Sequence, residues 1–181
     1  MLNQLGYYLE KKGDYARALP LCEQALAIWQ TVLGANHPNT ATSLNNLAAL
    51  YESQGNYARA LPLFEQALAI CQTVLGATHP DTATSLNNLA ELYRSQGDYT
   101  RALPLYEQAL AIQQTVLGEN HPYTAISLNN LALLYESQGD YARALPLVEQ
   151  ALKIFQQVLG DEHPHTKTVA ENYQQVLNQC A

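Results

Sequence analysis

Apolar residues recur at helical spacing in two consecutive segments near the middle of the chain. In residues 80–95, apolar side chains fall at i, i+3, i+4 and i+7, which predicts a helix with one buried stripe: Leu86, Leu89, Ala90 and Tyr93. In residues 99–117 a second stripe predicts a second helix that buries Ala102, Tyr106, Ala109, Leu110, Ile112 and Val116. A short polar turn separates the two segments, so the pattern predicts a helical pair.

This pair is copied along the chain with a period of 42 residues. The period is visible in several sets of identical residues spaced 42 positions apart. Two of these sets are Gly13, Gly55, Gly97 and Gly139, and Pro38, Pro80, Pro122 and Pro164. Regular self-similarity of this length is typical of repeat proteins, in which each unit contacts only its neighbours. We expect a partial first unit at 1–36, full units at 37–78, 79–120 and 121–162, and a capping helix at 163–181.

Residues at the predicted helix ends support these boundaries. A His-Pro pair opens the first helix of each unit, where proline is tolerated because that N–H has no helical partner. Gly97 is expected to end the helix as a left-handed cap, and Asp98 to cap the next one. Pro104 lies inside the second helix, where we expect it to bend the helix.

The two ends of the chain depart from the repeat. The first unit begins in the middle of a helix, which indicates a fragment of a longer array and leaves Leu2 to Leu9 without a preceding helix. The last helix replaces a small alanine with Gln174 and is polar elsewhere, as expected of a terminal cap.

Charge and composition narrow the classes of partner. Nine basic and 16 acidic residues give a net charge of −7, which argues against nucleic acid and against an anionic membrane surface. No apolar run approaches the roughly 20 residues of a membrane span, and the N-terminus lacks a signal-peptide pattern. We therefore expect a soluble, cytoplasmic protein. The three cysteines follow no disulfide or zinc spacing.

The histidines are the only repeated residues that suggest chemistry. His37, His79, His121 and His163 occur once per unit, and ligands of one metal ion must converge to about 2.0–2.1 Å from it. Residues spaced one unit apart cannot converge in this way, so we expect them to shape the start of each helix. No nucleophile triad, phosphate loop or zinc-protease motif is present. The prediction is a protein without catalysis, metal or cofactor.

One unit carries the signature of a known repeat. Its signature positions hold Leu47, Ala48, Tyr51, Gly55, Tyr57, Ala60, Phe64 and Ala67, and they resemble those of the tetratricopeptide repeat. The longer period, the LNNLA segment and linkers such as VLGENHP are similar to the repeats of kinesin light chain and its bacterial, especially cyanobacterial, relatives. The resemblance implies an all-α, right-handed superhelical solenoid of antiparallel helix pairs that serves as a protein–protein interaction scaffold.

The resemblance also implies a site, the concave groove lined by the first helix of each pair. An asparagine offers two donors and an acceptor, so a ladder of them can hold the backbone of an extended peptide. The expected groove residues are Asn45, Asn46, Asn87, Asn88, Asn129, Asn130, Glu52, Glu91, Arg94 and Glu136. The alternative is that the asparagines bond to neighbouring helices and fix their stacking. With Arg94 the only cation among these positions, a clamp for a carboxylate is not expected.

Two other functions remain open at this stage. The uncovered N-terminal end would allow a self-associating structural spacer, and the chain could be the regulatory repeat fragment of a larger multidomain signalling protein. The pattern predicts a protein or peptide ligand without naming it.

Overall fold

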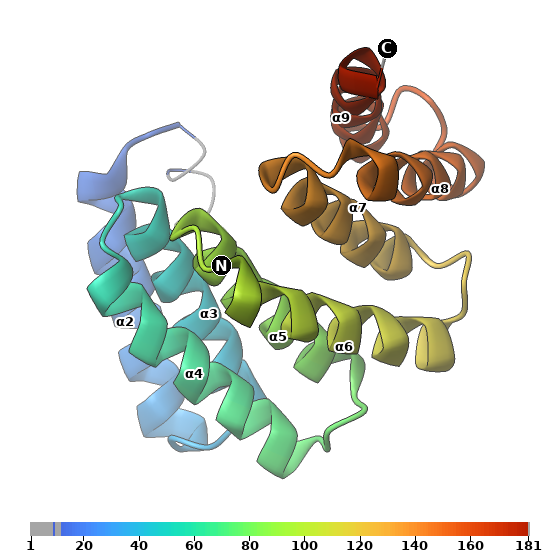
Figure 1. Ribbon diagram of the computed structural model, residues 1–181. Coiled ribbons are helices and arrows are strands. Elements are labelled where there is room, and N and C mark those ends of the chain that lie inside the picture. Colours follow the sequence, from blue (N-terminus) through green and yellow to red (C-terminus); the bar gives the residue numbers. More distant parts are fainter. Residues whose placement is uncertain (1–8, 10–11, 181) are drawn as a thin grey trace. The chain divides into compact units, whose positions relative to one another are not determined.

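The computed structural model describes residues 9 and 12–180, and its regular elements there are all α-helices. They are α2 (Tyr15–Leu33), α3 (Pro38–Ser53), α4 (Tyr57–Val74), α5 (Pro80–Ser95), α6 (Tyr99–Leu117), α7 (Pro122–Ser137), α8 (Tyr141–Leu159) and α9 (Pro164–Cys180) (Figure 1). We call α3, α5, α7 and α9 the A helices and α2, α4, α6 and α8 the B helices. The expected half-helix before Gly13 lies largely outside the described residues.

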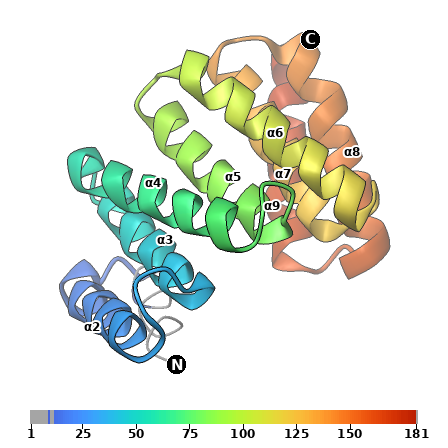
Figure 2. The ribbon, with the colours of Figure 1, turned by 90° about the horizontal axis from the view of Figure 1, so that it is seen from below.

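The chain divides into two compact units, Met1–Leu92 and Tyr93–Ala181. In the first unit, α3 packs against both α2 and α4, and α3 and α4 run side by side in both ribbon views (Figures 1 and 2). Their contact buries small and branched side chains together: Ala41, Leu44, Ala67, Ile70 and Cys71. Small alanines at such positions let two helices approach closely.

In the second unit, α7 packs against α6 and α8, and α8 packs against α9. The largest side chains that this unit buries completely include Tyr106 and Phe155. The helices α3 and α7 thus each have a B helix on either side, as the repeat pattern predicts.

Each A helix begins at the proline of its His-Pro pair. The preceding histidine is the N-cap: Nδ1 of His37 accepts a hydrogen bond from the backbone N–H of Asn39 at 3.1 Å. A threonine two residues after the proline bonds to the segment that connects the helix to the preceding one. Thr40 Oγ1 donates to the carbonyl oxygen of Gly34 at 2.8 Å. The same two bonds recur at the starts of α5, α7 and α9.

The turn between helices follows the predicted caps. Gly97 has a φ of +76°, a conformation that side chains with a Cβ rarely adopt. The N–H of Asp98 donates to the carbonyl oxygen of Tyr93 at 2.8 Å, and the side chain of Asp98 accepts from the N–H of Arg101. Asp14, Asn56 and Asp140 cap their helices in the same way, which confirms the prediction for all four B helices.

The predicted core face of α6 is mostly confirmed. Ala102, Tyr106, Ala109 and Ile112 are buried and Leu110 is partly buried, but the prediction for Val116 is wrong, because this side chain is 48% exposed. Its equivalents Val32, Val74 and Val158 are exposed as well. The B helices are longer than the A helices, 19 residues in α8 against 16 in α7, and these valines lie in the last turn of their helices.

Two further expectations concern α6 and α9. The helix α6 continues without interruption through Pro104, whose side chain is exposed. The bend expected at this proline remains a prediction.

In α9, Thr166, Val169 and Val176 are buried, whereas Gln174 is exposed and donates from Nε2 to Asn178 Oδ1 at 3.2 Å. A polar side chain therefore occupies the position that Ala48 fills in α3.

Candidate binding surface on the A helices

Each full A helix carries two adjacent asparagines, and the structure distinguishes between them by their hydrogen bonds and, in α5 and α7, by their burial. In α5 and α7 the first of the pair is buried, with Asn87 5% exposed and Asn129 9% exposed, whereas Asn45 in α3 is partly exposed. The second is partly exposed in every case: Asn46, Asn88 and Asn130. We call the first set the inner asparagines and the second set the outer asparagines.

The inner asparagines connect A helices of successive repeats. Within the first unit, Asn45 Nδ2 donates to Ser85 Oγ at 3.1 Å. Within the second, Asn129 Oδ1 accepts from Asn172 Nδ2 at 2.9 Å. These bonds are the stacking contacts that the sequence left open as an alternative to ligand binding.

The outer asparagines keep their side-chain amides available. Among the residues that the structure describes, the side chains of Asn46, Asn88 and Asn130 form no hydrogen bond or ion pair. An amide in this state can both donate to and accept from a ligand backbone. Sequence reasoning placed both asparagines of each pair in the groove and could not separate these two roles.

The charged residues expected in the groove are partly engaged within the protein. Arg94 Nη1 donates to Ser137 Oγ at 3.1 Å, and Glu136 Oε1 accepts from Gln175 Nε2 at 2.6 Å. Glu52 and Glu91 are partly exposed. The mixed charge that the sequence predicted for this surface is therefore present, with Arg94 and Glu136 held by neighbouring A helices.

Two aliphatic residues lie on the same side of α7 as Asn130. Leu133 occupies the place of Ala49 in α3, and Ile126 occupies the place of Thr42; both are partly exposed. The sequence analysis did not include Ile126 among the groove residues. Its signal was available, because an isoleucine replaces a threonine that is repeated in the other A helices.

The repeated histidines act as caps in the structure. His79 and His163 accept backbone N–H groups through Nδ1 at 3.1 and 3.2 Å, as His37 and His121 do. Over residues 9 and 12–180, no group of three histidine, cysteine, aspartate or glutamate side chains is placed to hold a metal ion. Shaping the start of each A helix is thus their observed role.

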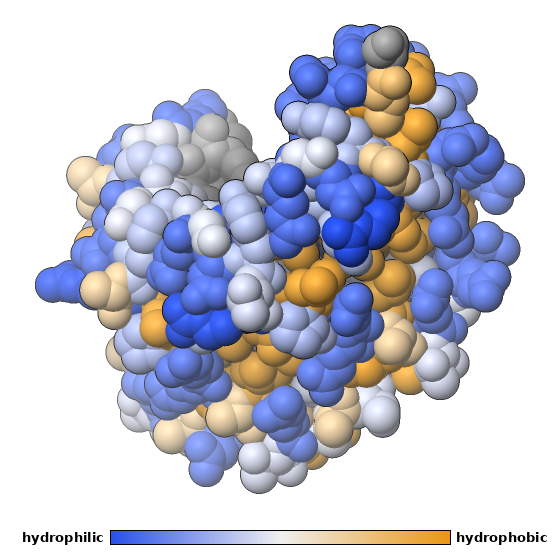
Figure 3. Space-filling model, in the orientation of Figure 1, coloured by the Kyte–Doolittle hydropathy of each residue, from blue (hydrophilic) through white to orange (hydrophobic). Residues whose placement is uncertain are grey.

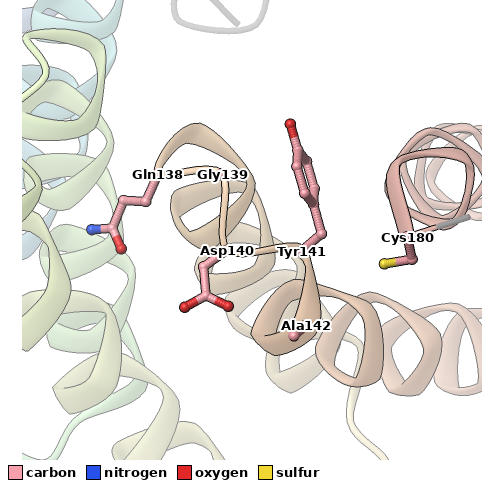
Figure 4. Close-up of a pocket in the computed structure, with 6 residues that line it drawn as sticks. All are labelled: Gln138, Gly139, Asp140, Tyr141, Ala142 and Cys180. Carbon is pink, nitrogen blue, oxygen red and sulfur yellow. The ribbon is translucent and has the colours of Figure 1, made fainter.

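An open hollow of about 510 Å³ lies away from the asparagines, beside the turn between α7 and α8. Its lining includes Tyr141 from the start of α8 and Cys180 from the end of α9, which stand on opposite sides of it (Figure 4). Asp140 at its edge is paired with Arg143. Sequence reasoning had not singled out this hollow.

The exposed surface is mixed in character. On the face shown in Figure 3, hydrophilic residues surround smaller hydrophobic areas. Within the described part of the chain, no helix combines the length and the apolar character required to cross a membrane.

Comparison with known proteins identifies the repeat. A sequence model described as tetratricopeptide repeat matches residues 1–73, 47–115 and 81–157. These matches overlap and extend over most of the 181 residues. The chain belongs to the tetratricopeptide repeat family. A search of curated proteins found no match.

Solved structures of tetratricopeptide repeats resemble this chain along nearly its whole length. The nearly identical TPR-like repeats of a Podosopora anserina protein named for kinesin light chain share 30% identity, with a TM-score of 0.75, over 99% of this chain and 85% of that one. A variant of the same repeats has a TM-score of 0.76 at the same identity, over 99% of this chain and 84% of that one.

A bacterial structure belongs to the same group. BtubC (BKLC) from P. vanneervenii shares 29% identity, with a TM-score of 0.79, over 99% of this chain and 71% of that one. The predicted resemblance to repeats of the kinesin light chain type, including bacterial ones, is confirmed, as is the all-α solenoid fold class. Tetratricopeptide arrays typically serve as protein–protein interaction scaffolds without catalysis.

Proposed function

We propose that this tetratricopeptide array binds an extended peptide segment of a partner protein on the exposed side of its A helices. The observation that carries the proposal is the difference between the two sets of asparagines. Of the inner set, Asn45 and Asn129 bond between repeats and Asn87 and Asn129 are buried, whereas the outer set is partly exposed and unbonded in the described structure.

The outer asparagines can form hydrogen bonds with the backbone of a bound peptide whatever its sequence. Asparagine is only a middling helix former, so its repetition in Asn46, Asn88 and Asn130 is not explained by helix stability. An unbonded amide can exchange its water contacts for the N–H and C=O groups of an extended ligand. Sequence preference must then come from residues that differ between repeats, such as Ala49, Glu91 and Leu133.

The test is a peptide-array screen followed by fluorescence anisotropy with the peptides that bind. The triple variant N46A/N88A/N130A should lose binding at least tenfold while keeping its helicity and melting temperature. The matched variant N45A/N87A/N129A removes the inner set and should lower the melting temperature. If the outer-set variant binds as tightly as the parent, the outer asparagines are not the site and the proposal fails.

A second function, self-association, is favoured by the exposed end of α2. Ile28 is 42% exposed, whereas its equivalents Ile70, Ile112 and Ile154 are 5%, 7% and 2% exposed. Val32 and Leu33 add further apolar surface in the last turn of α2, at 67% and 39% exposed. Exposed apolar surface of this kind can mark a contact site.

Sedimentation velocity over a range of protein concentrations tests this second function. A concentration-dependent oligomer that dissociates in an I28S/V32S variant would support self-association. A protein that remains monomeric at the highest concentration would exclude it, and leave peptide binding as the proposed function.

A further inference from the structure

The outer asparagine of α7 has a different setting from those of α3 and α5. Ile126, Asn130 and Leu133 lie at i, i+4 and i+7, so they share one side of the helix. All three are partly exposed. In α3 the matching residues are Thr42, Asn46 and Ala49, so the aliphatic pair distinguishes α7 from its copy.

The helix α9, which bonds to α7 through Asn172, carries a carboxylate of its own. Glu171 stands where the other A helices have their inner asparagine, and its side chain is exposed. It directly precedes Asn172, whose amide bonds to Asn129 on α7. Glu136 at the end of α7 is a second carboxylate on this side.

We propose that α7 and α9 select an extended peptide that presents an aliphatic side chain to Ile126 and Leu133 and a basic side chain to Glu171. This inference rests on the proposed peptide-binding function and adds the chemistry of the ligand. Asn130, between the two aliphatic residues, holds the peptide backbone. The aliphatic side chain of the ligand gains from removing apolar surface from water on both partners.

The charges on this surface favour a basic rather than an acidic side chain in the bound peptide. Arg94, the cation of this surface, already donates to Ser137, and the chain carries a net charge of −7. An acidic peptide would meet Glu136 and Glu171 as like charges, which disfavours the wrong partner.

The repeats themselves supply matched variants for the test. I126T/L133A gives α7 the residues of α3, and E171N gives α9 the asparagine of the other A helices. Because each residue already occurs at the same place in a folded helix of this chain, these changes should preserve the fold. Circular dichroism and the melting temperature check that they do.

The probe is a fluorescein-labelled nonapeptide library in which each position is occupied in turn by Leu, Ser, Asp or Lys, measured by anisotropy on the full chain. The parent should prefer Leu over Ser at one position by about tenfold, the discrimination expected when aliphatic side chains contact an apolar group of the ligand. I126T/L133A should abolish this preference and still bind the library. E171N should weaken a Lys-over-Ser preference at a nearby position by about two- to fivefold, as for an exposed ion pair.

Two outcomes separate this inference from the proposed function. If N130A loses binding but I126T/L133A retains the Leu preference, the ligand chemistry proposed here is wrong and peptide binding stands. If the parent binds no member of the library, both are wrong. A reciprocal variant, T42I/A49L, should create a second Leu preference in α3, and its failure to do so would count against the aliphatic assignment.

Discussion

Asn172 on α9 donates a hydrogen bond from Nδ2 to Oδ1 of Asn129 on α7 at 2.9 Å. The two residues are 43 positions apart, so the bond joins A helices of successive repeats rather than turns of one helix. Asn129 is 9% exposed, and a buried amide that loses its partner is destabilising. The bond thus joins α9 to α7 through a residue type for which the sequence left both ligand binding and helix stacking open.

A double-mutant cycle measures the contribution of this bond. N129A should lower the free energy of unfolding by about 1–3 kcal/mol, since it also leaves Asn172 without its partner. N172A and the double variant complete the cycle, with an expected coupling of about 0.5–1.5 kcal/mol in urea unfolding. A coupling near zero would mean that the asparagines do not hold the two helices together in solution.

The difference between inner and outer asparagines shows where sequence reasoning stops. Helix ends were predictable because caps depend on residues only a few positions away, as with Asp98 and Arg101. Asn45 and Asn46 are the same residue type one position apart, and only the location of Ser85 in another repeat separates their roles. Burial at helix ends is also hard to predict, since Val116 is on the predicted stripe but is 48% exposed in the last turn of α6.

Tyr93 provides a test of the core assignment. It is 7% exposed, and the Arg101 guanidinium carbon lies 4.3 Å from the centroid of its ring. Y93A should lower stability by about 3–5 kcal/mol, as other large aromatic truncations do. Tyr123 is 51% exposed, so Y123A should change stability by about 0.5 kcal/mol at most. Equal melting temperatures for the two variants would contradict the assigned faces.

The small residue on the core side of α7 should be intolerant of enlargement. Ala132 is 1% exposed on a helix that packs against α6 and α8. A132L should therefore destabilise the protein by about 1–3 kcal/mol through overpacking. Ala111 on α6 is exposed, and A111L serves as the control in the same chemical denaturation series. A neutral result for A132L would show that the α7 packing has free space.

Acid should weaken the caps of α6 and α8 but not that of α4. The backbone N–H and the guanidinium of Arg101 bond to Asp98 and lower its pKa, and the guanidinium and backbone N–H of Arg143 lower the pKa of Asp140. A carboxyl whose pKa is lower in the folded state stabilises the fold above its unfolded pKa, about 3.9. This stabilisation is lost as the pH falls through the folded pKa.

The α4 cap offers a natural comparison, because Asn56 fills the same place without a charge. D98N/D140N should retain both caps near neutral pH and show a smaller decrease in melting temperature between about pH 5 and pH 2. The comparison uses thermal unfolding followed by circular dichroism at several pH values. If the melting temperatures of parent and variant fall in parallel as the pH is lowered, these carboxylates do not contribute to the loss of stability in acid.

The histidine caps can be tested at His37, where the α3 helix begins. Its Nδ1 accepts the N–H of Asn39 at 3.1 Å, and its backbone has extended angles, φ −86° and ψ 145°, as an N-cap residue requires. H37A removes the acceptor and should reduce stability by about 0.5–2 kcal/mol. Asparagine is among the preferred N-cap residues, so H37N should restore most of that loss. If H37A and H37N were equally destabilised, the contribution of His37 would come from packing of the ring, and the repeated His-Pro pair would need another explanation than capping.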